Sequence, residues 1–325
     1  MSNPAESAAK KIAWELGSWK AIEFRISEDF ENTDPQRMPS QPRTFHATYR
    51  YIETAADQRM YEYRLNPDND PGTGIGIEYT DGSRCAQLLR NDTNDQPGQE
   101  QVAIKRYFGQ ENGGYTHRPE PLKSLYVGLK PLPEVLAGAS SIGEERRLGR
   151  DCDRFLFSRV QGEKDPGLHV YWLDRETGLT LRSEFYRNQQ DWSREAPNSV
   201  WNAESVDTVE GHHLVLKSEI LTYNPDGPNP GRPVMRHHDV VDEVSFDRAY
   251  PATTFWPAIT DQTRVLDYVA NKVVSPKKPV QKTATTATPI QAVDPGGWSV
   301  SYSSAALLLG AIALGVGFFL HRRRG

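Results

Sequence analysis

Cysteine and the sequence motifs of common enzymes are what this chain lacks most clearly. Its 325 residues include only two cysteines, Cys85 and Cys152, which are too few for a four-thiolate zinc site or a disulfide-rich scaffold. One disulfide between them and two unpaired buried thiols both remain open interpretations. The chain also has no G-x-S-x-G elbow and no G-x-x-x-x-G-K-[ST] loop. These absences argue against a serine hydrolase and against a P-loop nucleotide-binding protein.

An excess of positive charge is also absent, since the formal net charge is -5. No long-range basic field would attract nucleic acid, and we expect no nucleic-acid partner. Hydrophobic residues make up 37% and aromatic residues 10% of the sequence, which is enough to build a substantial core. The composition therefore favours a folded protein over a disordered one.

Long apolar runs are missing except at the C-terminal end. Residues 298–320 run for 23 positions without a formal charge, and the basic stretch 321–325 follows. This length predicts a transmembrane helix over 298–320, with Trp298 and Tyr302 at the headgroup interface. A buried helix of a soluble domain is the less favoured alternative.

The three arginines after the predicted span indicate that the C-terminus is cytoplasmic and that the preceding domain is extracytoplasmic, in the periplasm. Export requires a signal sequence, yet residues 1–19 contain no apolar core of about 7 to 15 residues. Two interpretations stay open: the true start lies upstream, which we favour, or the tail inserts and the domain remains in the cytoplasm.

Hydrophobic periodicity predicts one domain over residues 1–270. Residues 5–16 have helical spacing after Asn3 and Pro4, and a broken helical insertion is predicted over 121–143. The rest alternates with period two between turn signals, which is typical of antiparallel strands. Strands are predicted at 21–29, 44–54, 59–66, 75–80, 84–90, 101–108, 144–149, 152–160, 168–174, 179–188, 199–210, 212–223 and 234–247.

Proline, threonine and lysine dominate residues 271–297, a stretch poor in large apolar side chains. This composition predicts an extended linker between the domain and the span. The predicted order is therefore domain, linker, transmembrane helix and basic tail.

A group of motifs in the second half resembles a known superfamily. The hairpin VYWLDRETGLTLR lies at 170–182, an acidic-Gly turn at Glu210-Gly211, and an F-x-P exit at 255–257. In this pattern the chain resembles the periplasmic lipoprotein-localisation proteins LolA and LolB and the related sensor RseB. Independently of the family, the Asp174–Gly178 segment has the residues of a polar turn with glycine at positive φ.

The resemblance implies an α+β, mainly antiparallel β fold: an incomplete half β-barrel of about 11 strands, capped by helices. It also implies an apolar interior that receives a lipid or a lipidated protein segment, within envelope lipoprotein or lipid handling. A shuttling carrier cannot be tethered to one membrane, so a membrane-anchored binding protein is the predicted role. The alternative is an RseB-like sensor or regulator that binds a membrane-protein partner.

Aromatic residues on the late predicted strands are candidates to line such a cavity, although ordinary core packing also explains them. Burying acyl chains requires no catalytic group, so we expect no enzyme activity and no cofactor. The candidates are Phe155, Phe157, Tyr171, Trp172, Phe185, Trp201 and Tyr223.

Two histidine pairs, His212-His213 and His237-His238, lie on predicted strands that a hairpin would pair. Because neighbouring residues of a strand face opposite sides, at most one histidine of each pair could join a site. We therefore expect packed or exposed strand histidines, and no metal site.

Overall fold

A computed structural model covers most of the chain up to residue 274. It describes residues 3–34, 44–66, 74–81, 84–91, 101–106, 119–127, 130–158, 167–227, 229–260, 263–267, 270 and 272–274. The predicted membrane span at 298–320 and its basic tail lie outside these ranges. Within them, no helix is long and apolar enough to cross a bilayer.

Strands dominate the described residues. They are β1 (Ala21–Asn32), β2 (Thr44–Thr54), β3 (Arg59–Asn66), β4 (Gly74–Thr80), β5 (Arg84–Asn91), β6 (Gln101–Arg106), β7 (Tyr126–Val127), β8 (Lys130–Pro131), β9 (Ser140–Arg147), β10 (Arg150–Ser158), β11 (Leu168–Asp174), β12 (Thr180–Tyr186), β13 (Ser199–Val209), β14 (His212–Tyr223), β15 (Pro233–Phe246), β16 (Arg264–Asp267) and β17 (Lys272–Val274). The helices are α1 (Pro4–Ser18), η2 (Glu120–Ser124), α2 (Leu132–Leu136), α3 (Gln189–Ser193) and η3 (Ala252–Phe255).

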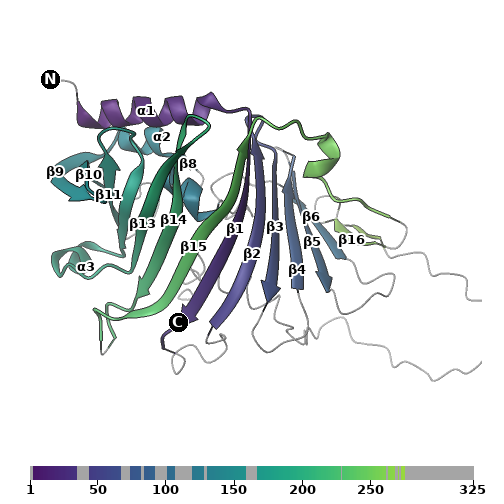
Figure 1. Cartoon of the computed structure of the whole chain (residues 1–325). Coiled ribbons are helices and arrows are strands. Elements are labelled where there is room, and N and C mark those ends of the chain that lie inside the picture. The colour runs from purple at the N-terminus through teal and green to yellow at the C-terminus, as the bar shows by residue number, and fades with distance from the viewer. Residues whose placement is uncertain are drawn as a thin grey trace, which may run out of the picture.

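Most strands join in one open sheet with the order β17-β16-β6-β5-β4-β3-β2-β1-β15-β14-β13-β12-β11-β10-β9. Its pairs are antiparallel except for β16 with β6, which is parallel. The mainly antiparallel β class is confirmed. The strand number is corrected: the resemblance implied about 11 strands, but this sheet has 15, because the short edge strands β16 and β17 join the thirteen that alternation predicted. Figure 1 shows the strands fanned into a curved surface with α1 across their ends.

Period-two alternation located all of the long strands. Each predicted strand overlaps an observed one, and the short strands β7, β8, β16 and β17 were missed. The helical insertion predicted over 121–143 is partly wrong, because residues from 140 onward form β9. Likewise, 272–274 pair as β17 where the linker was predicted to have begun.

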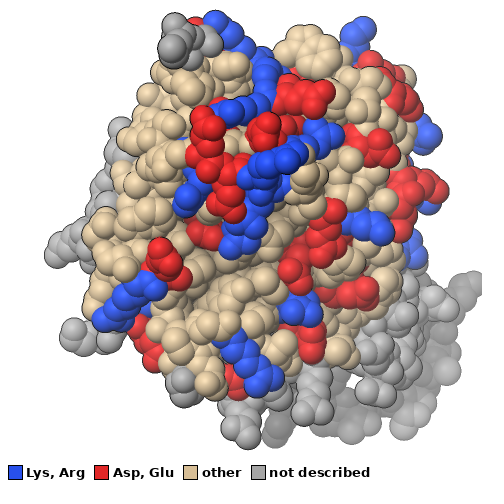
Figure 2. Space-filling model, turned by 60° about the vertical axis from the view of Figure 1, so that its left-hand side comes forward, with Lys and Arg blue, Asp and Glu red and all other residues tan. Residues whose placement is uncertain are grey.

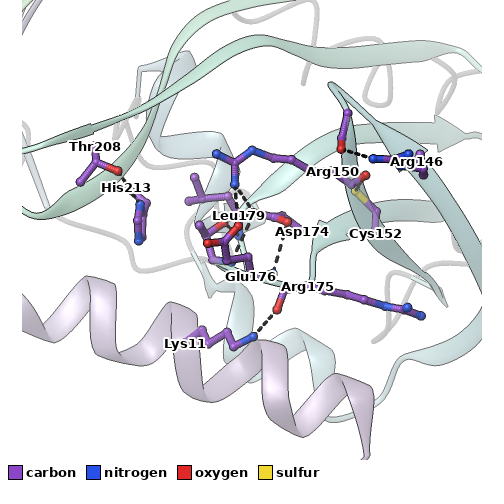
Figure 3. Close-up of polar contacts among 12 residues, drawn as sticks. Lys11, Arg146, Arg150, Cys152, Asp174, Arg175, Glu176, Leu179, Thr208 and His213 are labelled. Atoms are coloured by element: carbon purple, nitrogen blue, oxygen red, sulfur yellow. Dashed lines mark hydrogen bonds and ion pairs between the residues drawn. The ribbon is translucent and has the colours of Figure 1, made fainter.

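Helix α1 begins as predicted, since the Asn3 side chain accepts a hydrogen bond from Ala5 N at 3.1 Å. It is held to the turn between β11 and β12, where Lys11 Nζ donates to the Arg175 carbonyl oxygen (Figure 3). At its other end, Glu15 Oε1 lies 2.9 Å from His212 Nδ1 on β14. The helix is thus fixed across the ends of several strands.

The hairpin that carries the family resemblance has a structural role in this docking. Asp174 is 2% exposed, and its Oδ2 accepts from Arg150 Nη1 at 3.0 Å and from Thr177 Oγ1 at 2.6 Å. Gly178 follows with φ +82, and its Cα lies against Ala8, Lys11 and Ile12 of α1. The motif therefore shapes a turn against which the first helix packs.

Replacing Gly178 with alanine should lower the free energy of unfolding by about 2 kcal/mol, measured by urea denaturation. A Cβ there would lie 3.1 Å from Lys11 Cβ and 3.2 Å from the Ala8 carbonyl oxygen. Gly211→Ala is the matched control, because Gly211 has φ +87 and nothing within 4 Å of its Cβ position. The control should lose only the backbone contribution of about 1 kcal/mol; equal losses would contradict the proposed crowding against α1.

The F-x-P exit motif also has a role in packing. Phe255 is 1% exposed and belongs to a second, smaller core with Ile52, Met60 and Tyr79. Tyr250 contacts the Phe255 ring at 6.2 Å between centroids. The chain after β15 thus covers one face of β2–β5.

Candidate functional site

The inner face of the sheet is defined here as the face covered by residues 119–127 and 130–136, which we call the cover segment. Five of the predicted cavity residues lie on this face. Cross-strand register places Phe155 opposite Tyr171, and Trp201 opposite Ser183. Phe157 contacts Tyr171 at 5.1 Å between ring centroids. The five are Phe155, Phe157, Tyr171, Phe185 and Trp201.

Trp172 and Tyr223, also predicted to line the cavity, lie on the opposite or outer face. Three guanidinium groups lie over the Trp172 ring, with Arg154 at 5.0 Å from the centroid. Tyr223 interacts electrostatically with Arg182 and Glu219, which also belong to the outer face. The geometry therefore leaves these two aromatic residues apart from the other five.

Ion pairs cover the outer face. Arg182 lies 2.5 Å from Glu184, and Arg236 lies 3.0 Å from Glu219. Figure 2, with the β9 side of the sheet turned toward the viewer, shows basic and acidic side chains interleaved. This face is therefore polar, in contrast to the inner one.

Aromatic residues of the first half extend the inner wall, and the sequence analysis did not select them. Phe30 stacks on Phe45 at 4.6 Å, and Tyr49 stacks on Tyr61 at 5.3 Å between ring centroids. The signal was present as alternation in TFHATYRYIET and RMYEYRLN. Together these side chains form what we call the aromatic wall: Phe30, Phe45, Tyr49, Tyr51, Tyr61, Tyr63, Phe155, Phe157, Tyr171 and Trp201.

The cover segment packs leucines against this wall. Leu122, Leu125 and Leu132 are fully buried, and Leu136 is 2% exposed. All four belong to the same core cluster as the aromatic wall. Contacts run from η2 to β12, β14 and β15, and from α2 to α1 and β10. One short segment therefore covers the inner side chains of several strands.

Acidic and hydroxyl groups interrupt the apolar inner face. Ser218, Asp239 and Glu28 lie side by side in register on β14, β15 and β1, and Glu120 of η2 interacts electrostatically with Asp239 and Glu28. These four residues, which we call the polar niche, are each no more than 8% exposed. The sequence analysis missed the niche.

Burial and like charge raise the pKa of two acidic groups of the niche. Burial raises the pKa of Asp239 well above its usual range, and the nearby Glu28 and Glu120 charges raise it further. Burial also raises the pKa of Glu120, an effect that its ion pair with Lys123 opposes. The niche therefore holds carboxyl groups that repel one another in a poorly solvated place.

The four late-strand histidines are separated. His212 contacts Glu15, and His213 Nδ1 lies 2.9 Å from Thr208 Oγ1. At the other end of the hairpin, His237 Nδ1 lies 2.5 Å from Glu28 Oε1 on the inner face. His238 Nε2 lies 2.7 Å from Glu204 Oε2 on the outer face. Within the described part of the chain, no three His, Cys, Asp or Glu residues are grouped as a metal site.

A serine, a histidine and a glutamate meet where α1 contacts β14, but their arrangement differs from a catalytic triad. Ser18 Oγ lies 3.1 Å and Glu15 Oε1 lies 2.9 Å from the same atom, Nδ1 of His212. A relay needs the serine and the carboxylate on opposite ring nitrogens. This contact therefore fastens the helix to the strand.

No disulfide joins the two cysteines. Cys85 lies on β5 and Cys152 on β10, far apart in the order of the sheet, and both are buried. Burial raises the pKa of the Cys152 thiol to about 11. Of the two interpretations that the sequence left open, the structure shows buried thiols.

The fold and this face define a class of protein: a large open antiparallel sheet whose aromatic inner face lies beneath a short cover. No family model and no curated protein sequence matches the chain. Solved structures match it. The chain is similar to a DUF1329 family protein from Desulfovibrio piger, with 9% identity and a TM-score of 0.47 over 78% of this chain and 98% of that one.

Two further similar structures come from the group that the sequence motifs had indicated. One is a putative outer membrane lipoprotein-sorting protein domain from Vibrio parahaemolyticus, with 12% identity and a TM-score of 0.44 over 77% of this chain and 95% of that one. The other is a LolA superfamily protein from Nitrosomonas europaea, with 9% identity and a TM-score of 0.44 over 79% and 99%. The resemblance is thus confirmed as a structural likeness.

Proposed function

We propose that this chain is a non-enzymatic binding protein that accepts an acyl chain of a lipid or of a lipidated protein segment on its inner face. In this proposal residues 298–320 anchor it in the membrane, and the sheet lies on the extracytoplasmic side. The observation that supports the proposal is the aromatic wall, which spans strands of both halves of the chain and shares one core with the leucines of the cover segment.

The energetics of this binding need no catalytic group. Burial of an acyl chain of about 12 methylenes supplies on the order of 10 kcal/mol before ordering costs. Aromatic and aliphatic side chains are sufficient to provide such a surface. Ligand entry then requires the cover segment to move, since its buried leucines pack in the same core as the aromatic wall.

Two adjacent residues on β14 allow a matched test of which face of the sheet binds the acyl chain. Ile220 lies on the inner face opposite Trp201, and Leu221 lies on the outer face opposite Val200. Both are partly exposed, so both should tolerate replacement by aspartate. For the full-length protein and a neutral fluorescent monoacylglycerol, Ile220→Asp should weaken binding by about tenfold or more, because it places a charge beside the acyl chain.

Leu221→Asp should leave the affinity unchanged, as measured in the same fluorescence titration. Equal effects of the two substitutions, or no binding by the unmodified protein at any accessible concentration, would exclude an acyl site on the inner face. Native mass spectrometry of the protein as purified would detect a lipid that is carried along.

The alternative is a sensor or regulator that binds a membrane-protein partner. The observation that favours it is the complete burial of Leu122, Leu125 and Leu132 against the aromatic wall, because a permanently covered wall has no room for an acyl chain. In that case the cover stays in place and the partner contacts the outside of the domain. Failure of the acyl-binding test therefore points to this function.

A further inference from the structure

Three of the four residues of the polar niche lie within the aromatic wall, in one row of the sheet, and Glu120 belongs to the cover segment. Ser218 lies opposite Asp239, and Asp239 lies opposite Glu28. The next row of the inner face holds Ile220, His237, Phe30 and Phe45. A ligand whose apolar chain lies on that row would thus present its head group to the niche.

Three acceptor atoms of the niche have no hydrogen-bond partner among the residues that the structure describes. They are Ser218 Oγ, Asp239 Oδ2 and Glu120 Oε2. The residues are 1%, 4% and 8% exposed, so water does not replace the missing partners freely. A buried polar atom without a partner costs about 1 to 3 kcal/mol, more if charged, which makes three in one place exceptional.

Among the described residues, the carboxyl groups of the niche outnumber the cationic groups that face it. Glu28, Asp239 and Glu120 are three carboxyl groups, and Lys123, paired with Glu120, is the lysine that acts on Asp239 and Glu120. His237 contacts Glu28 from the neighbouring row. The charges of these acidic groups also add to the effect of burial, which raises the pKa of Tyr61. Among the described residues, the niche therefore has more carboxyl groups than cationic partners.

We infer that the polar niche binds the primary ammonium head of an amphiphilic ligand, with Ser218, Asp239 and Glu120 accepting its hydrogen bonds. An ammonium group has three N–H donors and no acceptor, which matches the three unpartnered oxygens. An organic cation fits better than a metal ion, because the described acidic and histidine groups are not arranged as a metal site. This inference rests on the proposed function and specifies the head group of the ligand.

Three probes of equal chain length separate the head group from the tail: octylammonium, octanol and octanoate. Titrated into the full-length protein at neutral pH and followed by native mass spectrometry, octylammonium should bind about tenfold more tightly than octanol. Octanoate should bind most weakly, because its charge repels the niche. This comparison uses the unmodified protein and does not depend on any variant folding.

Substitutions on β15 and on the neighbouring strand β14 then show which residues cause the preference. Asp239→Asn should abolish the preference for octylammonium while octanol still binds, and Ser218→Ala should reduce it. Asp242→Asn is the matched control on the same strand, since Asp242 is exposed and accepts a hydrogen bond from Ser27 Oγ at 2.6 Å. It should leave all three affinities unchanged.

Equal binding of octylammonium and octanol would overturn the ammonium site and leave the proposed acyl-binding function standing. A preference that survives in Asp239→Asn would overturn it as well, because the cation would then be held elsewhere. If none of the three probes binds, both this inference and the proposed function fail.

Discussion

Replacing Arg59 with methionine lowers the free energy of unfolding by about 3 to 5 kcal/mol, the loss expected when one partner of a buried ion pair is removed. Arg59 Nε lies 3.1 Å from Glu53 Oε1, and the two side chains are 6% and 4% exposed. Tyr51 Oη also donates to Glu53 Oε2 at 2.6 Å. Methionine keeps most of the side-chain volume but removes the guanidinium that compensates the buried carboxylate. Urea denaturation monitored by circular dichroism measures the effect.

Arg64 provides the control on the same strand. Its Nη2 lies 3.0 Å from Glu62 Oε1, but the Arg64 side chain is 56% exposed. An exposed pair of this kind contributes about 0 to 1 kcal/mol, so Arg64→Met should change stability little. Similar losses for both variants would show that burial does not determine the contribution of the Arg59 pair.

Leu125→Asp is the second substitution for which we expect a large loss of stability, because it places a charge in the middle of the cover segment. Leu125 is fully buried, and its carbonyl oxygen accepts a hydrogen bond from Leu132 N at 2.9 Å, which links the two parts of the cover. We expect the free energy of unfolding to fall by about 3 to 5 kcal/mol, from lost packing and a buried charge. We also expect the cover to leave the aromatic wall, so that an apolar dye such as bis-ANS binds with severalfold higher fluorescence.

Glu134→Gln is the control in α2, where Glu134 is exposed, and it should alter neither stability nor dye fluorescence. Near-ultraviolet circular dichroism distinguishes release of the cover from global unfolding. Unchanged dye binding by a folded Leu125→Asp protein would contradict the idea that the cover segment shields the wall.

The sequence predicted the sheet well because one physical signal repeats along it. Side chains alternate between faces, so stretches such as TFHATYRYIET reveal their strands without knowledge of their neighbours. The short strands β16 and β17 gave no such signal, since three or four residues are too few to show a period. Their pairing at the edge depends on contacts distant in sequence.

The candidate site was predicted only in part, and the error has a simple cause. Tyr171 and Trp172 were both selected, yet adjacent residues of a strand face opposite sides. Tyr171 joins the aromatic wall, whereas Trp172 lies beneath arginines on the outer face. Which face is the inner one depends on the location of the cover segment, and local alternation does not specify this.

The polar niche could not be predicted from local sequence. Glu28, Asp239 and Ser218 come from strands that are neighbours only after folding, and Glu120 comes from the cover segment. On its own, each reads as an ordinary polar residue of a strand or turn. Their shared burial appears only when the register of β1, β15 and β14 is known.

The last strand has a mechanical consequence. β17 ends at Val274 and pairs through three residues with β16, at the outermost position of the sheet. Tension applied to the chain beyond Val274 would therefore peel this strand away one hydrogen bond at a time, while the longer pairings further in keep their shape. The pairing of β17 with β16 is thus the part of the sheet that yields first when the C-terminal end of the chain is pulled.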